Sequence, residues 1–292
     1  MFTPSANIFS LLYFCLLFVA VLSASDELRA VLEFKKGIKH DPLGRVLDSW
    51  NKTSVSVTAD HYGCPSSFYG VICDEASNSV TAIVLERLQL RGELKFFTLT
   101  GLRMLKNLNL AGNYFTGRLV PALGSMSSLQ HLDLSDNLFY GPIPKRFNDL
   151  YGLIYLNLSS NRFFGWYPSG VRNLQQLRVL DFHSNEISGD VGIFFSELSN
   201  VEHVDLSSNM FSGSLPSDPK NVSGLGNTLQ HLNLSHNRLN GDFFSNDTMA
   251  LFRNLKVLDL GAVWCNTRRD TNEFNSFGRT ESLRKLLLRF SS

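Results

Sequence analysis

The chain has 292 residues and a mass of 32.8 kDa, which is enough for one large domain or two ordinary ones. Hydrophobic residues make up 43% and charged residues 18%, a composition that excludes a disordered or collagen-like chain. The 27 Lys and Arg residues nearly balance the 26 Asp and Glu residues, so no charge excess points to a nucleic acid or an anionic membrane as partner. Four cysteines are too few for a disulfide-dense scaffold.

The first 25 residues carry no charged side chain, and they contain an apolar run from Ile8 to Leu22. Small residues follow at positions 23–25, and the run is shorter than the ~20 residues that a membrane-spanning helix needs. This pattern predicts a signal peptide over residues 1–25, and therefore a secreted chain without a further membrane span. An uncleaved membrane anchor is the alternative.

Secretion changes the meaning of the cysteines and of several asparagines. Cys15 leaves with the signal peptide, whereas Cys64 and Cys73 lie close together in the sequence and are expected to pair. Cys265 is then left over. Asn-x-Ser/Thr triplets, which are candidate glycosylation sites in a secreted chain, occur at Asn51, Asn157, Asn221, Asn233 and Asn246.

A helix is expected directly after the signal peptide, over residues 26–39. Apolar side chains recur there at helical spacing, at Leu28, Val31, Leu32, Phe34 and Ile38.

A repeat governs the rest of the chain. The template LxxLxLxxNx(F/L/I)xG occurs six times between Leu105 and Gly241, and its asparagines are 24, 24, 24, 24 and 28 residues apart. A divergent first copy begins at Val80, and an eighth begins at Leu255. Because the LxL segment alternates sides, each copy predicts one short strand, and neighbouring copies would stack these strands into one parallel sheet. No single copy can bury its own core, so each depends on its neighbours.

The repeat and its flanks resemble plant leucine-rich-repeat receptor-like kinases. Gly-x-(Ile/Leu)-Pro follows the template at residues 141–144 and 213–216, with a variant at 165–168, which is similar to the plant-specific repeat LxxLxLxxNxLxGxIP. The segments DPLGRVLDSW (41–50) and CPSSFYGVIC (64–73) resemble the N-terminal cap of this family. Phe68 stands in place of the family's tryptophan, and Cys64 lies two residues earlier than in the family pattern.

The resemblance implies an α/β leucine-rich-repeat solenoid, a curved right-handed stack of coils with one parallel β-sheet. It implies a helical N-terminal cap over residues 26–79, with a Cys64–Cys73 disulfide, and the repeats over residues 80–260. The template asparagines should bond the backbone of adjacent coils as a ladder, at Asn113, Asn137, Asn161, Asn185, Asn209 and Asn237. The phenylalanines at the next apolar position should stack as a spine, at Phe115, Phe139, Phe163 and Phe211.

Residues 261–292 depart from the template. Val263 stands where the asparagine is expected, although Leu283, Leu286 and Leu288 recover part of the strand pattern and could dock as a last strand. Because a solenoid needs a terminal cap that hides its last apolar edge, the segment is interpreted as a divergent, truncated tail. The genuine cap of a short protein is the alternative.

Counted from the first leucine of each copy of the template, positions 3, 5, 7 and 8 are expected to face the concave surface. The candidate ligand-binding residues there are Asp133, Tyr155, Asp181, His183, His203, Asp205, His231 and His236. The Asn/Asp column at position 5 is interpreted either as solvated repeat consensus or as a polar floor that hydrogen-bonds an extended peptide. The histidines reflect either chance placement or pH-sensitive binding. Glycans at Asn157 and Asn233, in the same column, would mask the concave centre and shift binding to the lateral faces or to unmasked coils.

The sequence contains no kinase, zinc-peptidase or serine-hydrolase motif. His131 and His203 lie three coils apart, roughly 14 Å at ~4.8 Å per strand, which is too far to share one metal ion, whereas His203 and His231 lie on adjacent coils. We therefore expect no catalytic residue, no metal and no cofactor.

Two functions stay open at this stage. The resemblance implies an extracellular recognition module that binds a peptide or another leucine-rich-repeat ectodomain and no nucleic acid. It places the chain in the secretory pathway and outside the cell, and a full-length parent, with one transmembrane helix and a kinase domain that can be catalytically weak, in the plasma membrane. The alternative is a secreted soluble protein that acts as a hydrolase inhibitor or a decoy receptor.

Overall fold

The structure is a computed structural model that describes residues 26–51, 64–215, 225–239, 254–261 and 285–287. Several sequence predictions therefore lie outside the described residues. They are the signal peptide over residues 1–25, the glycosylation sites Asn221 and Asn246, the leftover Cys265, and the tail leucines Leu283 and Leu288.

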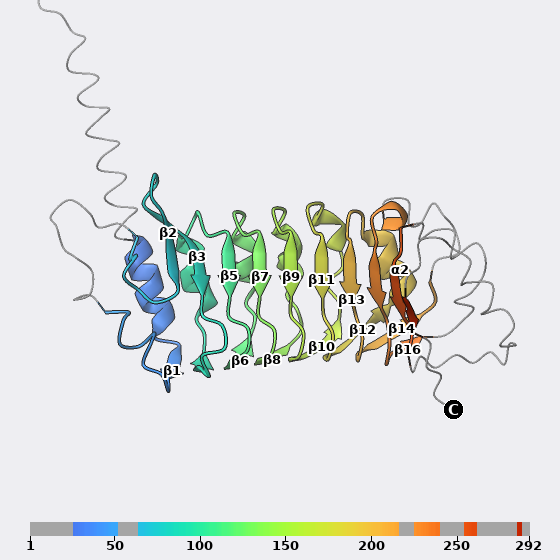
Figure 1. Ribbon diagram of the computed structural model, residues 1–292, viewed down its shortest axis with the longest axis horizontal. Helices are drawn as coiled ribbons and strands as arrows, with labels where there is room; N and C mark the ends of the chain where they lie inside the picture. The colour runs from blue at the N-terminus through green and yellow to red at the C-terminus, as the bar shows by residue number, and fades with distance from the viewer. Residues whose placement is uncertain (1–25, 52–63, 216–224, 240–253, 262–284, 288–292) are drawn as a thin grey trace, which may run out of the picture.

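The predicted solenoid is confirmed, and its concave face is a long parallel sheet that curves along the stack (Figure 1). Over the described residues this sheet has ten strands, in the order β18-β17-β15-β13-β11-β9-β7-β5-β3-β2. Only β2 runs antiparallel to its neighbour. The strands are β2 (Val71–Asp74), β3 (Ser79–Val84), β5 (Asn107–Asn109), β7 (His131–Asp133), β9 (Tyr155–Asn157), β11 (Val179–Asp181), β13 (His203–Asp205), β15 (His231–Asn233), β17 (Val257–Asp259) and β18 (Lys285–Leu287). In β18, Leu286 is paired with Leu258 of β17, so a last strand forms at this leucine.

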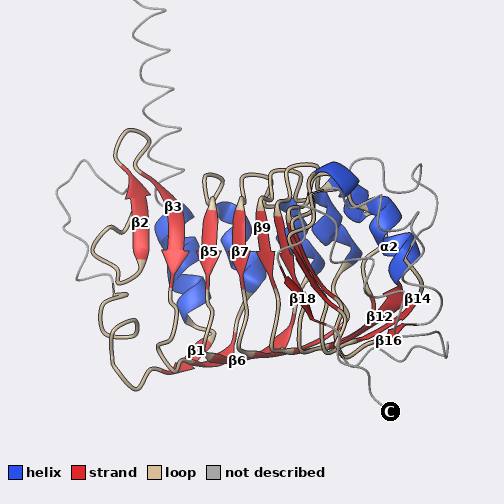
Figure 2. Ribbon diagram, turned by 45° about the vertical axis from the view of Figure 1, so that its right-hand side comes forward, coloured by secondary structure: helices blue, strands red, loops and turns tan. Residues whose placement is uncertain are grey.

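A second sheet, which the sequence analysis did not predict, runs along one side of the solenoid (Figure 2). Over the described residues its order is β1-β4-β6-β8-β10-β12-β14-β16, and only β1 pairs antiparallel. The strands are β1 (Ile38–His40), β4 (Arg91–Glu93), β6 (Tyr114–Arg118), β8 (Leu138–Gly141), β10 (Arg162–Trp166), β12 (Glu186–Asp190), β14 (Met210–Gly213) and β16 (Arg238–Leu239). In this sheet the strands from β6 to β16 each begin just after a template asparagine and end near the template glycine. The φ of that glycine is +107° at Gly117 and +91° at Gly141, values that strain any other residue.

Short helices close the coils on the side opposite the concave sheet (Figure 2). They are the 3-10 helices η2 (Phe96–Gly101), η3 (Pro121–Ser125), η4 (Lys145–Asp149), η5 (Val171–Asn173) and η7 (Leu225–Asn227), and the α-helix α2 (Val191–Glu197). The Asp190 carboxylate caps α2 by accepting from Ile193 N at 2.9 Å. Within the described part of the chain, no helix has the length and apolar character to cross a membrane.

The N-terminal cap begins with a helix over residues 26–35, four residues shorter than predicted. The chain turns at Gly37 because it must pass close to β4: a Cβ on Gly37 would lie 2.6 Å from the Glu93 carbonyl oxygen. Ile38, predicted to extend the helix, instead pairs with Gly92 as part of β1. The cap thus covers the first edge of the second sheet.

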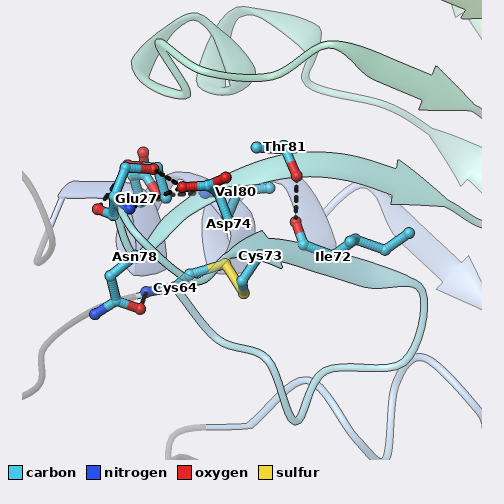
Figure 3. The surroundings of a disulfide bond; sticks show 10 residues. Glu27, Cys64, Ile72, Cys73, Asp74, Asn78, Val80 and Thr81 are labelled. Carbon is cyan, nitrogen blue, oxygen red and sulfur yellow. Dashed lines mark hydrogen bonds between the residues drawn. A yellow bond between two sulfur atoms is a disulfide. The ribbon is translucent and has the colours of Figure 1, made fainter.

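A disulfide joins Cys64 to Cys73 and ties the cap to the first strands of the concave sheet (Figure 3). Cys73 lies in β2, and Cys64 N donates to Asn78 O, in the β2–β3 turn, at 3.1 Å. From the helix, the Glu27 carboxylate accepts from Val80 N at 2.8 Å. Burial raises the pKa of Glu27, and this hydrogen bond partly offsets the effect.

Phe68 is buried in the cap against a second aromatic side chain. Its ring stacks on Trp50 with centroids 5.8 Å apart, and Trp50 Nε1 donates to Tyr69 O at 2.9 Å. The phenylalanine at the family's tryptophan position therefore fills the core of the cap.

The six template asparagines form a continuous ladder. In each coil the side-chain amide donates to a backbone carbonyl of the preceding coil, as Asn137 Nδ2 does to Leu110 O at 2.9 Å. The side-chain oxygen accepts from a backbone N–H of the preceding coil, as Asn137 Oδ1 does from Phe115 N at 3.0 Å. Equivalent bonds are made by Asn113, Asn161, Asn185, Asn209 and Asn237. The ladder thus satisfies polar backbone groups at each junction between coils.

All four spine phenylalanines are buried, but they do not form one uniform stack. Phe115 and Phe139 stack with centroids 6.5 Å apart. The ring of Phe211 instead packs against the rings of Tyr167 and Phe194, with centroid distances of 6.3 and 5.8 Å. The template position is taken by Ile187 in the preceding coil, which separates Phe211 from the other three phenylalanines along the row.

We predict that Asn137→Ala lowers the free energy of unfolding by roughly 1–3 kcal/mol, because it removes the side-chain acceptor of the buried Phe115 N–H and one of the two side-chain donors to the Leu110 carbonyl. Denaturant unfolding followed by circular dichroism measures the change. The matched control is Asn107→Ala, on the concave face outside the ladder, which should change stability by no more than about 0.5 kcal/mol. Equal losses in the two variants would contradict the role of the ladder.

Candidate functional site on the concave sheet

The predicted concave residues lie in parallel rows across the sheet. In most of these strands the central leucine or valine is buried and its two neighbours are partly exposed on the concave side. Strand register aligns equivalent positions, so that His203 is paired with His231 and Asp181 with Asp205. The candidate residues in strands therefore occupy two rows, and His183 and His236 follow in the turns after their strands.

Every residue of the position-5 row caps the turn after its own strand. One side-chain oxygen accepts from the backbone N–H two residues later, as Asp133 Oδ1 does from Ser135 N at 3.0 Å. The same bond is made by Asn109, Asn157, Asp181, Asp205, Asn233 and Asp259. This column therefore has a structural reason to be Asn or Asp, and the second polar atom of each side chain takes no part in the cap.

Several of those second atoms join neighbouring coils. The Tyr155 hydroxyl donates to Asp133 Oδ2 at 3.2 Å and accepts from Asn157 Nδ2 at 3.2 Å. Partial burial of Tyr155, with the nearby Asp133 charge, raises the pKa of its phenol, so the hydroxyl stays protonated and can donate. Tyr155 is thereby held in place on the concave floor.

A second linked pair lies three coils further along. Asn233 Nδ2 donates to Asp205 Oδ2 at 3.0 Å, and in the adjacent row the rings of His203 and His231 lie 5.3 Å apart. Burial lowers the pKa of His231, and the neighbouring His203 and Lys256 act in the same direction.

His183 lies between these two groups. Its Nδ1 donates to Asp181 Oδ1 at 2.8 Å, and its Nε2 lies 3.3 Å from Ser160 Oγ. The hydrogen bond that His183 donates to the Asp181 carboxylate raises the pKa of His183 despite partial burial, and the Asp205 charge adds to the effect. Ser160 is a contact that the sequence analysis missed, although its position-8 place in the preceding coil could have indicated it.

Candidate ligand atoms of Asp181, His183 and Asp205 lie within 4.8 Å of one another, a spacing compatible with a divalent cation. However, the Asp181–His183 hydrogen bond already engages two of the three side chains, and both carboxylates also cap turns. The arrangement is explained by these bonds without a metal ion.

The remaining candidates are not drawn into one pocket. His236 is exposed and occupies the left-handed turn position, with φ +55°, that Ser160 and Ser208 occupy in other coils. From β7 to β15 the sheet spans four strand spacings, roughly 19 Å at ~4.8 Å each. The candidate residues thus form an elongated polar strip, suited to an extended ligand rather than to a small molecule.

Two of the glycosylation candidates belong to this strip. Asn157 and Asn233 are partly exposed, and the oxygen of each accepts from the hydroxyl of its own triplet, Ser159 at 2.7 Å and Ser235 at 2.8 Å. Asn51, on the cap, is also partly exposed. A glycan on either strip asparagine would project over the candidate residues.

We predict that the imidazole of His183 titrates above, and that of His231 below, the ordinary pKa of about 6.5. The stability contribution of His183 is fully present below about pH 6.5 and is lost as pH rises through its raised folded-state pKa. The stability contribution of His231 has the opposite pH dependence: it is present above about pH 6.5 and is lost as the pH falls through the lowered folded-state pKa. Because the two effects oppose each other, the pKa values must be measured at each site, by NMR titration.

The matched variants for this titration are Asp181→Asn and Asp259→Asn, which replace the same template position in different coils. Asp181→Asn should lower the pKa of His183, since it removes the carboxylate that accepts from Nδ1. Asp259→Asn should leave it unchanged. A His183 pKa that is insensitive to Asp181→Asn would contradict the assignment.

Family models match both parts of the chain. Residues 24–74 match the family described as "Leucine rich repeat N-terminal domain". The description "Leucine Rich Repeat" applies to residues 104–126, 128–150, 152–174, 200–222 and 228–247.

Similar proteins come from plants. A protein of Arabidopsis thaliana described as a probable inactive receptor kinase is 62% identical over 234 residues, which are 80% of this chain and 22% of that protein. The crystal structure of the Arabidopsis receptor kinase HAESA ectodomain, in complex with a peptide hormone, is 25% identical with a TM-score of 0.74, covering 92% of this chain and 42% of that one. A chain of the Arabidopsis BIR3–SERK2 complex is 29% identical with a TM-score of 0.50, covering 58% of this chain and 87% of that one.

The matches extend through both the cap and the repeats, and the chain spans about a fifth of the length of its receptor-kinase relative. The coils are stacked as in the solved ectodomain. The chain therefore belongs to the leucine-rich-repeat family, and over its cap and repeats it is similar to the ectodomains of plant receptor kinases.

Proposed function

We propose that this chain is an extracellular recognition module of a plant receptor kinase, and that its concave strip binds a peptide or a partner ectodomain. The observation that carries the proposal is the polar strip itself. Most of its members are partly exposed and aligned across adjacent strands, and several are fixed by hydrogen bonds, for example between Tyr155 and Asp133 and between Asn233 and Asp205. A preorganised row of donors and acceptors can bind an extended backbone at a low cost in side-chain entropy.

The similar proteins support this use of the fold. The HAESA ectodomain was solved with a peptide hormone, and the BIR3–SERK2 structure is a complex of two proteins. The relatives do not favour a hydrolase inhibitor or decoy receptor, because a protein that is 62% identical to this chain is described as a probable inactive receptor kinase.

The module is proposed to act without catalysis and outside the cell. The described concave side chains are engaged in turn caps and cross-strand bonds, and the sequence contains no kinase motif. The predicted signal peptide over residues 1–25 and the glycosylation triplets fit the secretory pathway.

Binding is tested with the secreted chain on a biosensor against a panel of synthetic plant signalling peptides and a panel of plant leucine-rich-repeat ectodomains. For a genuine ligand, the triple variant Tyr155→Ala/His203→Ala/His231→Ala should weaken binding at least about tenfold, because it removes side chains along the strip while leaving the turn caps intact.

The matched control for this triple variant is Tyr151→Ala/His40→Ala, which removes exposed residues of the same types away from the strip. The control should bind as the wild type does. Failure of every probe to bind, or undiminished binding by the triple variant, would count against the concave site.

Glycan occupancy provides an independent prediction. Glycopeptide mass spectrometry of chain secreted from plant cells should find Asn157 or Asn233 occupied in at least part of the product. Ser159→Ala and Ser235→Ala abolish the acceptor triplets while keeping both asparagines and their turn caps. If glycans mask the strip, these variants should bind a panel ligand more tightly, whereas Thr53→Ala, which removes the triplet at Asn51 on the cap, should not. Stronger binding by Thr53→Ala alone would contradict masking at the strip.

A further inference from the structure

We propose that the outer face of the second sheet, over β4, β6, β8 and β10, is a separate docking surface for a protein partner that presents carboxylates around apolar side chains. This surface, called the aromatic–arginine face below, consists of Tyr114, Tyr140, Phe164 and Trp166 with Arg91, Arg118 and Arg162. It is distinct from the concave strip, and the inference does not depend on the function proposed for that strip.

The aromatic side chains of this face point away from the core. Along β6, β8 and β10, alternate residues are buried as the spine phenylalanines, so the residues between them are directed outward. Trp166 is 68% exposed, Tyr114 45%, Phe164 44% and Tyr140 39%. Large aromatic groups gathered on consecutive strands are unusual on a monomer surface and indicate an interaction site.

Three arginines share the same face. In the sheet register Arg118 is paired with Tyr140, which is paired in turn with Arg162, so that two guanidinium groups flank one tyrosine. The Arg91 guanidinium lies 4.9 Å from the Tyr114 ring centroid, and that of Arg118 lies 5.7 Å from the Tyr140 ring centroid. Among the residues that the structure describes, none forms an ion pair with these arginines.

Carboxylates lie only at the two edges of this face. Glu93 is on β4, with its side chain against Gly117, and Glu186 and Asp190 are on β12. The outward positions of β6, β8 and β10 carry four aromatic side chains and two arginines, and none of them carries a carboxylate. A partner with acidic groups opposite Arg118 and Arg162 would therefore meet a positive, apolar centre.

The composition matches the core of protein–protein interfaces. Tyr, Trp, Phe and Arg are enriched at such cores, whereas Lys, Asp and Glu are depleted. Aromatic side chains with few rotatable bonds lose little entropy when a partner covers them, and unpaired guanidinium groups select a partner of opposite charge. A second copy of the chain fits less well, because two-fold pairing about β8 would set Arg118 against Arg162 of the other copy.

The experiment uses the secreted full chain and a displayed library of random twelve-residue peptides as the probe. Selection on the wild-type chain, with counter-selection on a Trp166→Ser/Arg118→Glu variant, should enrich peptides that combine Asp or Glu with apolar residues. Each enriched peptide should bind Trp166→Ser and Arg162→Glu at least about tenfold more weakly than the wild type. Binding should also weaken with added salt.

Two controls separate this face from other surfaces. Tyr151→Ser and Arg103→Glu replace exposed residues of the same kinds elsewhere and should leave binding unchanged. The concave triple variant Tyr155→Ala/His203→Ala/His231→Ala should also bind the enriched peptides normally, so failure of the concave proposal and failure of this one are distinguishable. Circular dichroism verifies that every variant is folded.

Three results would overturn the proposal. The first is an enriched set without an excess of carboxylates, and the second is equal binding by the Trp166→Ser and control variants. The third is a wild-type dimer in sedimentation velocity that Arg162→Glu dissociates, which would assign the face to a second copy of the chain.

Discussion

The fold depends on satisfying the polar backbone at each junction between coils. A coil of about two dozen residues buries too little apolar surface to stand alone, and the chain turns away from the sheet at a point where its backbone groups face the neighbouring coil. An asparagine at that point is short enough to reach the preceding coil and carries both a donor and an acceptor, as Asn137 shows with Leu110 and Phe115. The constant spacing of the coils, the straight rows of side chains and both sheets follow from this ladder.

The same turn explains why the concave surface is polar. The position-5 residue at the end of each strand caps the following turn, because one of its side-chain oxygens accepts from the backbone N–H two residues later. Asp or Asn therefore recurs along the sheet for a structural reason. What differs between coils is the second polar atom and the position-3 side chain. Tyr155 joins Asp133, Asn233 joins Asp205, and His183 is held by Asp181. A ligand at the proposed strip would meet these coil-specific side chains rather than the turn caps that all coils share.

The second sheet gives the solenoid another surface with different chemistry. Its inward residues complete the phenylalanine core, and its outward residues on β6, β8 and β10 include four aromatic side chains and two arginines. An extended ligand along the concave strip and a protein partner on the aromatic–arginine face would contact different sides of the coils. A repeat protein with two such faces can bring two molecules together without a conformational change.

The sequence by itself determined the solenoid, the identity of the ladder asparagines and the alignment of the concave columns, because these depend on residue types at fixed spacing within one coil. It also indicated the cysteine pair that the structure joins as a disulfide. It placed the end of the cap helix too late, since Gly37 turns only because β4 passes beside it. Only the tertiary structure decided the second sheet, the Tyr155–Asp133 bond and the pairing of Tyr140 with Arg118 and Arg162. Each of these joins residues more than twenty positions apart, and the register between coils, which no single repeat encodes, sets their contact.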